Sequence, residues 1–517
     1  MRRRIITLSV LGVLIVVAMI RLSGPVLSRI VRLRTEEVLK SQFQSSLTFD
    51  NFQVSIFPRI HATVQDVVLR LHGRTDLPPL IEIGKLTIDT SLLSFFGPRP
   101  HVSLIRLDGL RLHFPPHQVG EPPLIGATTE NLKVKYPMVI GRLEADDALV
   151  ETLRSDPSKE PRQFAIHRLL LTNASFDRPV DFHADLTNPV PQGEIHTTGK
   201  LGPWVAEDPA ETPVQANFSF DHADLATLKG LQGILSSKGT FQGPLDYLQV
   251  DGETETPDFA LRTAAHPTAL HTAYSAIVDG TNGNTYLKNV DAKFLNTEIL
   301  CSGEIVGVPG EKGRHIDLNA TSENARIEDL LFLVVRSDEP VMTGAVRLKT
   351  KILIPPRNDG ANGDIEDRMA LDGQFDVVQA LFTNPQTQEK VDALSRRGQG
   401  KPKDTDIDRE VSGLKGSFQL TDAVATFSNL LFDVQGAEVR LHGTYNLDSE
   451  ELAFQGHLLL QAKLSQTTTG AKSFLLKVLN PFFKGKNSGT DLPIKITGTK
   501  DKAVFGLDLH DSGNPKR

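Results

Sequence analysis

The chain contains very little cysteine. Cys301 is its single cysteine in 517 residues, so no disulfide can form within the chain. Exported proteins of animal secretory compartments commonly carry disulfides, so an exported chain without them fits a bacterial periplasm better. Cys301 is in register with Ile299 and Ile305, and this alternation predicts a small buried hydrophobic side chain rather than a reactive thiol.

An excess of positive charge is also missing. The formal net charge is -7 at pH 7, and the sequence pI is about 6.1. Proteins that bind nucleic acid through the phosphate backbone carry a basic surface, which this composition does not suggest. We therefore predict no nucleic-acid partner.

The usual catalytic and metal-binding motifs are absent from the sequence. We find no Gly-x-Ser-x-Gly, His-Glu-x-x-His, P-loop or Cys-x-x-Cys pattern, and the 15 histidines do not follow metal-ligand spacing. Asp404, Asp406 and Asp408 resemble the start of a calcium loop, but Arg409 stands where that loop needs glycine. We therefore predict no catalytic residue, no cofactor and no metal site, and an exported hydrolase is the weakest of our functional hypotheses.

One long apolar run is present, from Ile5 to Ile20, directly after three arginines. As a helix it would span about 24 Å, and residues 22–27 would extend it to the roughly 30 Å of a hydrocarbon core. The preceding arginines favour a cytoplasmic N-terminus. We predict a transmembrane anchor over residues 1–27, with a cleaved signal peptide as the alternative; both export the bulk of the chain.

Beyond this run, residues 28–45 have the pattern of an amphipathic helix, lying near the lipid surface or capping a core. The apolar period then changes to two, which is typical of strands with one apolar and one wet face. We predict such strands at 54–56, 60–71, 81–88, 110–114, 290–294, 299–305, 414–420, 454–460 and 505–509.

A second pattern places a glycine ahead of strand residues, as at Gly239, Gly344, Gly416 and Gly443. We expect these glycines at turns or at bends of a curved sheet. Apolar spacing predicts short helices before some of them, at residues 225–235, at 327–335 and around Val391 and Leu394. Polar composition predicts exposed loops or linkers at residues 115–123, 154–161, 355–369 and 396–409.

Residues 473–483 form the most apolar helical segment after the N-terminal run. The pattern is compatible with a helix packed on the end of the sheet, or with one that contacts lipid or fills an apolar groove. Our candidate lipid-facing residues come from this segment and from the inward faces of two strands: Phe418, Phe454, Phe474, Leu475, Phe482 and Phe483.

Both ends of the chain resemble a known family. The Arg-rich start, the single N-terminal helix and the pattern from Leu47 through Phe57-Pro58-Arg59-Ile60 to Val67-Val68-Leu69 are similar to the N-terminal domain of the AsmA family of bacterial envelope proteins. The stretch Phe482-Phe483-Lys484-Gly485 and the run Asp491-Leu492-Pro493-Ile494-Lys495-Ile496-Thr497-Gly498-Thr499 resemble that family's closing strands. The middle of the chain resembles it only in its strand pattern.

The resemblance implies a mostly β fold with interspersed short helices. In it, an N-terminal transmembrane helix leads into an elongated, curved, groove-like antiparallel sheet in the periplasm. We expect an anchor at 1–27, an AsmA-like N-terminal β domain at 28–120, a central β-rich region at 121–355 and a C-terminal AsmA-like region at 356–517. The resemblance implies no catalytic residues.

Two functional hypotheses follow. The first is an inner-membrane-anchored periplasmic protein that contributes to phospholipid transport or lipid homeostasis through an apolar groove. The second is a non-catalytic tethered scaffold that assists outer-membrane protein assembly or envelope integrity. Membrane phospholipids, and possible envelope proteins, are the expected partners. The alternation of the strands is the same for an open groove and for a closed core, so the sequence leaves both open.

Overall fold

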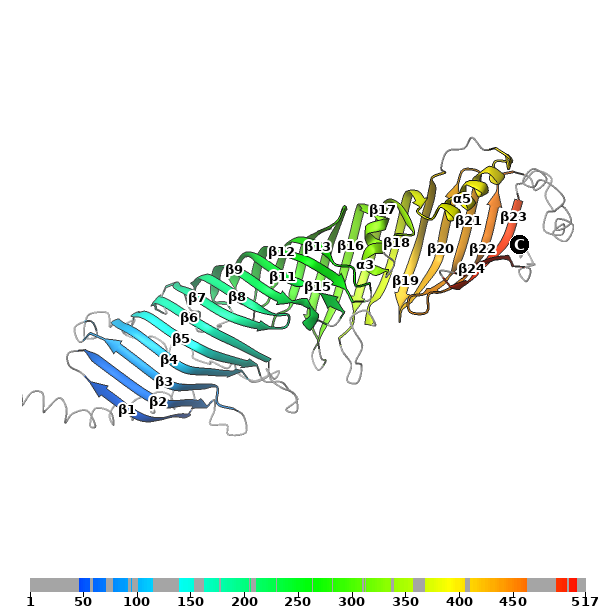
Figure 1. Ribbon diagram of the computed structural model, residues 1–517. Helices are drawn as coiled ribbons and strands as arrows, with labels where there is room; N and C mark the ends of the chain where they lie inside the picture. The colour runs from blue at the N-terminus through cyan, green and yellow to red at the C-terminus, as the bar shows by residue number, and fades with distance from the viewer. Residues whose placement is uncertain are drawn as a thin grey trace, which may run out of the picture. The chain divides into compact units, whose positions relative to one another are not determined.

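A computed structural model shows a protein built mostly of β-strands with few short helices (Figure 1). The structure describes residues 46–55, 59–70, 78–91, 94, 101–114, 139–152, 162–175, 178–203, 205, 211–228, 230–262, 264–280, 282–308, 311, 313–335, 339–356, 368–404, 410–462, 490–499 and 502–508. Within these residues, no helix has both the length and the apolar character needed to cross a membrane. The predicted anchor, the helix predicted at 28–45 and the segment 473–483 lie outside them.

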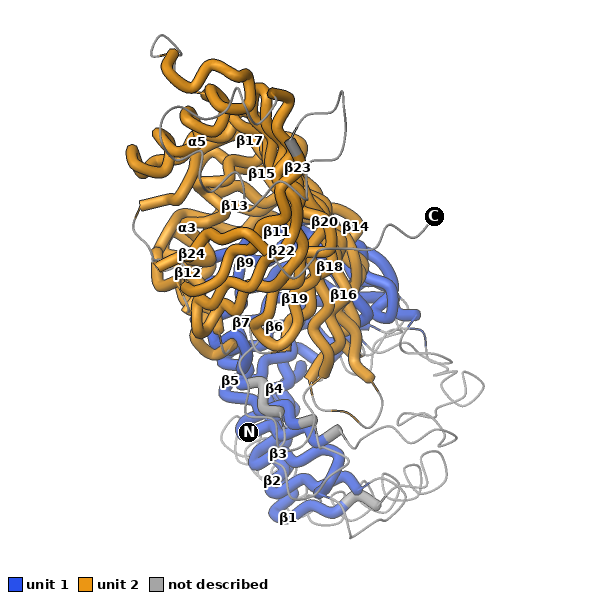
Figure 2. Tube along the Cα trace, turned by 90° about the vertical axis from the view of Figure 1, so that its right-hand side faces the viewer, with its two compact units in different colours: residues 1–224, 236–252, 278–281 blue, residues 225–235, 253–277, 282–517 orange. Residues whose placement is uncertain are grey.

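The chain divides into two compact units (Figure 2). Unit 1 comprises residues 1–224, 236–252 and 278–281, and unit 2 comprises residues 225–235, 253–277 and 282–517. Each unit consists of several separate residue ranges, because the middle strands of the chain contribute residues to both units.

Unit 1 is a twisted sheet in which successive strands pair. Its strands are β1 (Ser46–Ser55), β2 (Ile60–Arg70), β3 (Ile81–Thr90), β4 (His101–Phe114), β5 (Val139–Thr152), β6 (Arg162–Ala174), β7 (Val180–Pro189), β8 (Gln192–Leu201) and β9 (Pro213–Asp224). The pairs are antiparallel, except that β4 and β5 are parallel. The chain between β4 and β5 has the length that a parallel connection requires, about a dozen residues or more. The predicted antiparallel sheet is therefore confirmed with this one exception.

Unit 2 continues the same pattern of strand pairing. It begins with the 3-10 turn η3 (Leu225–Thr227) and the two-residue strand β10 (Leu231–Gln232). The strands β11 (Ile234–Pro244), β12 (Leu248–Leu261) and β13 (Thr268–Val278) have residues in both units. The remaining strands are β14 (Thr285–Phe294), β15 (Thr297–Gly307), β16 (Arg314–Arg326), β17 (Met342–Ile354), β18 (Ala370–Phe382), β19 (Ser412–Thr421), β20 (Val424–Val434), β21 (Ala437–Asn446), β22 (Glu451–Leu460), β23 (Thr490–Thr499) and β24 (Lys502–Leu507).

From β14 to β24, each strand of unit 2 is antiparallel to the next. Within the part of the chain that the structure describes, the helices α3 (Ile327–Val334) and α5 (Pro385–Gly398) lie between these strands. Both were predicted from apolar spacing. The helix predicted at 225–235 is wrong: only η3 is helical, and Leu231 and Leu235 lie in strands. Here tertiary pairing overrides the local spacing, because β10 pairs with β12 and β11 pairs with β9.

One loop prediction also needs correction. The loop predicted at 396–409 begins inside α5, whose last residue is Gly398. Of the glycines expected at turns or at bends of the sheet, Gly239, Gly416 and Gly443 lie within strands. Gly416 and Gly443 lie close to register shifts in the β19–β20 and β20–β21 pairs, as expected of bends. Gly344 lies near the start of β17, beside a register shift in its pairing with β18, as expected of a bend.

Candidate functional site

One face of unit 2 is apolar from β17 to β24, and we call it the apolar face. Most cross-strand partners on this face are apolar or glycine on both sides, as at Leu414–Phe432, Val439–Leu458 and Phe454–Ile496. The opposite face carries mostly charged and amide side chains, as expected of a sheet with one wet side.

Four phenylalanines at the middle of this face form the aromatic cluster: Phe375, Phe418, Phe427 and Phe454. Ring centroids are 6.2 Å apart for Phe375–Phe418, 6.5 Å for Phe418–Phe427 and 5.7 Å for Phe427–Phe454. The rings are mutually tilted, a geometry that adds favourable contact energy beyond area burial alone. The cluster spans β18, β19, β20 and β22.

Each phenylalanine of the cluster has a glycine as its cross-strand partner on an adjacent strand. Phe375 pairs with Gly416 and Phe418 pairs with Gly373, while Gly443 has Phe427 on one side and Phe454 on the other. A Cβ atom at Gly373 would lie 2.8 Å from the ring of Phe418. Gly373 therefore provides the space that the ring of Phe418 occupies.

Burial varies across the apolar face. Phe454 is only 8% exposed, whereas Phe375, Phe418 and Phe427 are half-buried and keep part of each ring accessible. Ile494 and Ile496 on β23 are also half-buried, and Phe505 on β24 is 70% exposed. The face is thus closed around Phe454 and increasingly open towards β24.

Helix α3 covers the end of the face near β16–β18. Its Ile327 and Leu330 pack on a buried group formed by Ala325, Val346 and Val377, together with Ala380. The buried carboxylate of Asp329 accepts hydrogen bonds from the Asn296 backbone N (2.9 Å) and from Thr297 Oγ1 (2.8 Å). Glu328 accepts another from the Gly344 backbone N at 3.0 Å. These contacts fix α3 to four strands, β15 to β18.

Helix α5 covers the same end of the strands as α3, but over β18, β20 and β21. Asn384 caps the helix, and Val391 packs with Val434, Ala437 and Leu460. Buried Gln388 accepts a hydrogen bond from the Phe382 backbone N at 2.9 Å and donates to Asp392 Oδ1 at 2.8 Å. Both helices are therefore fixed covers of one end of the strands, and the aromatic cluster lies beside them.

A polar hollow of about 660 Å³ lies on the opposite face, across β16 to β21. Arg347 and Asp376 form an ion pair of 3.5 Å in it, and Arg440 pairs with Glu438. Lys349 and Lys415 also line it. Positive and negative side chains alternate here, so the hollow is a hydrated, mixed-charge surface that does not select one sign of ligand charge.

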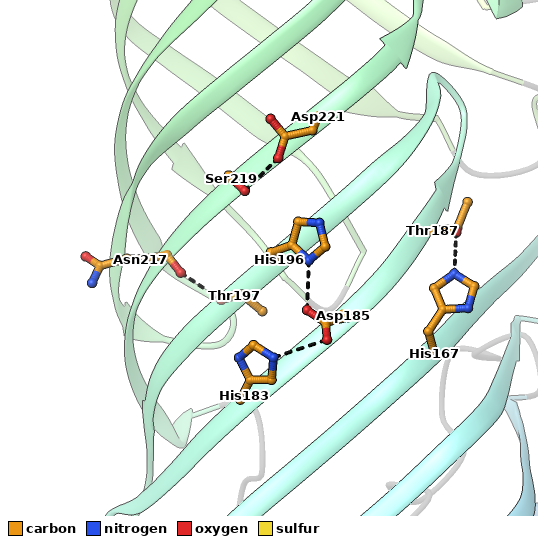
Figure 3. Close-up of polar contacts among 9 residues, drawn as sticks. All are labelled: His167, His183, Asp185, Thr187, His196, Thr197, Asn217, Ser219 and Asp221. Atoms are coloured by element: carbon orange, nitrogen blue, oxygen red, sulfur yellow. Dashed lines mark hydrogen bonds and ion pairs between the residues drawn. The ribbon is translucent and has the colours of Figure 1, made fainter.

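The polar face of unit 1 carries a row of histidine contacts (Figure 3). The carboxylate of Asp185 lies between His196 (Nδ1–Oδ1 2.8 Å) and His183 (Nε2–Oδ2 3.1 Å). The hydrogen bond to His196 lowers the pKa of Asp185, and the same bond raises the pKa of His196. Ser219 donates a hydrogen bond to Asp221 at 2.8 Å, and His167 Nε2 lies 2.7 Å from the hydroxyl of Thr187.

The structure places two of the six predicted lipid-facing residues on the apolar face. Phe418 and Phe454 both contact Phe427 and belong to one cluster. Phe474, Leu475, Phe482 and Phe483 lie outside the described residues. Cys301 lies on the corresponding face of β15 but is half-buried rather than fully buried, and burial raises the pKa of its thiol.

Sequence reasoning missed two members of the aromatic cluster, Phe375 and Phe427. Phe375 alternates correctly with Val377 and could have been found from the period of two. Phe427 and Leu430 differ in parity, so strict alternation puts them on opposite faces. A register shift in β20 brings both onto the apolar face, opposite Gly443 and Leu441.

The described residues contain no group of three or more histidine, cysteine or acidic side chains arranged to bind a metal ion. The geometry thus offers an apolar face that α3 and α5 cover at one end of the strands, and a hydrated, mixed-charge surface on the opposite face of the sheet. Comparison of the chain with known protein families, with curated proteins and with solved structures finds no match.

Proposed function

We propose that this protein holds phospholipid acyl chains on its apolar face and contributes to phospholipid transport or lipid homeostasis in a bacterial envelope. In this proposal residues 1–27 tether it to the inner membrane and the β-structure lies in the periplasm. The observation that carries the proposal is the half-buried aromatic cluster on a sheet face that opens towards β24. Its resemblance to AsmA proteins points the same way.

The physical argument rests on the hydrophobic effect. Removing an acyl chain from water is favourable by about 0.8 kcal/mol per methylene, so even a partly open face can hold a lipid while its head group stays hydrated. The half-buried rings of Phe375, Phe418 and Phe427 offer apolar surface to an extended chain. Such binding and release require no positioned acid, base or metal.

The runner-up function is a tethered scaffold with its apolar face closed. The low exposure of Phe454 and the hydrogen-bonded attachment of α3 and α5 favour it, because they show that part of the face is already a packed core. The two functions differ in whether the half-buried rings of the cluster, Phe418 and Phe427 among them, contact lipid.

A photo-crosslinking experiment in cells separates them. A benzoylphenylalanine placed at Phe418 in the full chain should crosslink to radiolabelled phospholipid. The same probe at Gln419, the exposed neighbour whose side chain points to the opposite face, should not. A further probe replaces Phe427, the neighbouring ring of the cluster. Equal labelling at Phe418 and Gln419, or no labelling at either Phe418 or Phe427, would contradict lipid binding at this face. Absence of labelling in a folded protein favours the scaffold.

A further inference from the structure

The strand β24 ends the described sheet of unit 2 and has properties that edge strands usually avoid. It pairs with β23 along residues 502–507 without a register shift. Natural edges are commonly protected by proline, a central charge or a bulge, and residues 503–507 contain none of these. Val504 is 61% exposed and Phe505 is 70% exposed, on opposite faces of the strand. Such an edge is a template for another strand.

The direction of its backbone groups follows from one hydrogen bond. The Asp508 N–H donates to Pro493 O at 3.0 Å, so residue 508 points towards β23. In an antiparallel ladder the N–H and C=O of one residue point to the same side, and successive residues alternate. Ala503, Phe505 and Leu507 therefore direct their backbone groups outward, away from β23.

This edge is complementary to itself. In an antiparallel pair of two β24 strands centred on Phe505, Ala503 of one copy lies opposite Leu507 of the other. Lys502 then lies opposite Asp508, so a positive and a negative side chain meet at both ends of the pair. A two-fold axis through residue 505 satisfies every outward backbone group of Ala503, Phe505 and Leu507.

We propose that the protein forms a two-fold dimer in which the β24 edges of two copies pair antiparallel, with Phe505 opposite Phe505. The axis is perpendicular to the sheet, so the apolar faces of both copies lie on the same side. Phe505 is in register with Ile496, which is in register with Phe454. The pairing thus joins the two apolar faces and covers the exposed ring of Phe505. The proposal rests on the edge alone and stands whether or not the face binds lipid.

Disulfide trapping of the full chain in membranes tests the register. In a Cys301→Ala background, Phe505→Cys should form an intermolecular disulfide under mild oxidation. Directly opposed residues that exchange hydrogen bonds lie about 5.5 Å apart at Cα, within the range that a disulfide spans. Lys502→Cys is the matched control: six residues of strand separate it from its copy, about 20 Å, so it should remain monomeric. Equal crosslinking at both positions, or none at residue 505, overturns the proposal.

A second measurement tests the forces that hold the pair. Ala503→Pro removes an outward N–H without removing a bond to β23, so it should lower the dimer fraction of the detergent-solubilised full chain measured by light scattering. Asp508→Lys should lower the fraction by placing two lysines together, and Lys502→Asp combined with Asp508→Lys should restore it. A wild-type chain that is monomeric at all concentrations, or a dimer unchanged in all three variants, shows that β24 is not the interface.

Discussion

At the scale of single residues, the apolar face of unit 2 depends on glycines that leave room for rings. Gly443 lies between Phe427 and Phe454, and a Cβ at this position would lie 2.1 Å from the Ala453 carbonyl oxygen and 2.6 Å from the Phe454 Cα. The obstacle is backbone, which cannot move away as a flexible side chain could. A glycine at position 443 is thus required by the close approach of the β22 backbone.

We expect Gly443→Ala to destabilise the protein by about 1–3 kcal/mol, because overpacking forces the two strands apart. The matched control is Gly506→Ala, where the nearest atom to the new Cβ would be Lys495 Cε at 3.7 Å. Urea unfolding of both variants measures the difference. Equal stability of the two variants would show that the sheet opens at Gly443 without cost.

The Asp185–His196 pair in unit 1 predicts a pH dependence. The raised pKa of His196 means that the pair's contribution is fully present below the unfolded histidine value of about 6.5 and is lost as pH rises through the folded pKa. The lowered pKa of Asp185 gives the acid limit: its contribution is present above the unfolded aspartate value of about 3.9 and is lost as pH falls through the folded pKa. The stabilising window therefore includes pH 5.5 and excludes strongly alkaline conditions.

We therefore expect His196→Gln to reduce stability more at pH 5.5 than at pH 8.5. Chemical unfolding of wild type and variant at both pH values provides the measurement. His196 is about half exposed, so solvent screening keeps the effect small. His442→Gln, an exposed histidine of unit 2, is the control for general effects of losing an imidazole. A loss that is the same at both pH values would show that the pair contributes no linked protonation.

At the scale of elements, a buried polar side chain near the start of each helix helps to attach it to the sheet. Asp329 in α3 is 4% exposed, and Gln388 in α5 is 3% exposed. Each accepts a hydrogen bond from a backbone N–H of an adjacent strand or turn. The helices therefore belong to the fold rather than acting as removable covers.

Asp329→Ala should cost roughly 2–4 kcal/mol, because it leaves the Asn296 N–H and the Thr297 hydroxyl without their acceptor. Limited proteolysis at the α3–β17 connection should become faster in parallel. Glu323→Ala, at an exposed position on β16, is the matched control and should change neither. Unchanged proteolysis in Asp329→Ala, together with unchanged stability, would show that α3 is held by its apolar contacts alone.

The sequence carried enough information to predict most of these elements, and the failures have physical causes. The strands around Val64, Ile299 and Leu458 follow from a period of two, and α3 follows from five apolar residues at helical spacing. The leucines at 225–235 have similar spacing, but strand pairing overrides it. Phe427 was missed because a bulge changes its face, and a bulge depends on the partner strand. The parallel β4–β5 pair also depends on tertiary context, since alternation is the same in both directions.

At the scale of the whole molecule, the proposed function requires that the N-terminal run delivers both units to the periplasm. Residues 5–20 lie outside the described structure, so this part of the proposal depends on their apolar composition and on the arginines before them. An acyl-chain surface is useful only where lipids leave a bilayer, and the predicted anchor would keep unit 1, which follows it in the chain, close to one.

A fusion of alkaline phosphatase to the C-terminus tests this arrangement, because the enzyme is active only after export. We expect the full-chain fusion to be active and to remain in the membrane fraction after alkaline carbonate extraction. Deleting residues 5–20 should abolish both activity and membrane retention, because no comparable apolar run follows in the sequence to replace the deleted one. An active fusion that carbonate releases would identify a cleaved signal peptide, and an inactive full-chain fusion would contradict the periplasmic location. In either case the apolar face of unit 2 would need a source of lipid other than the membrane in which the predicted anchor lies.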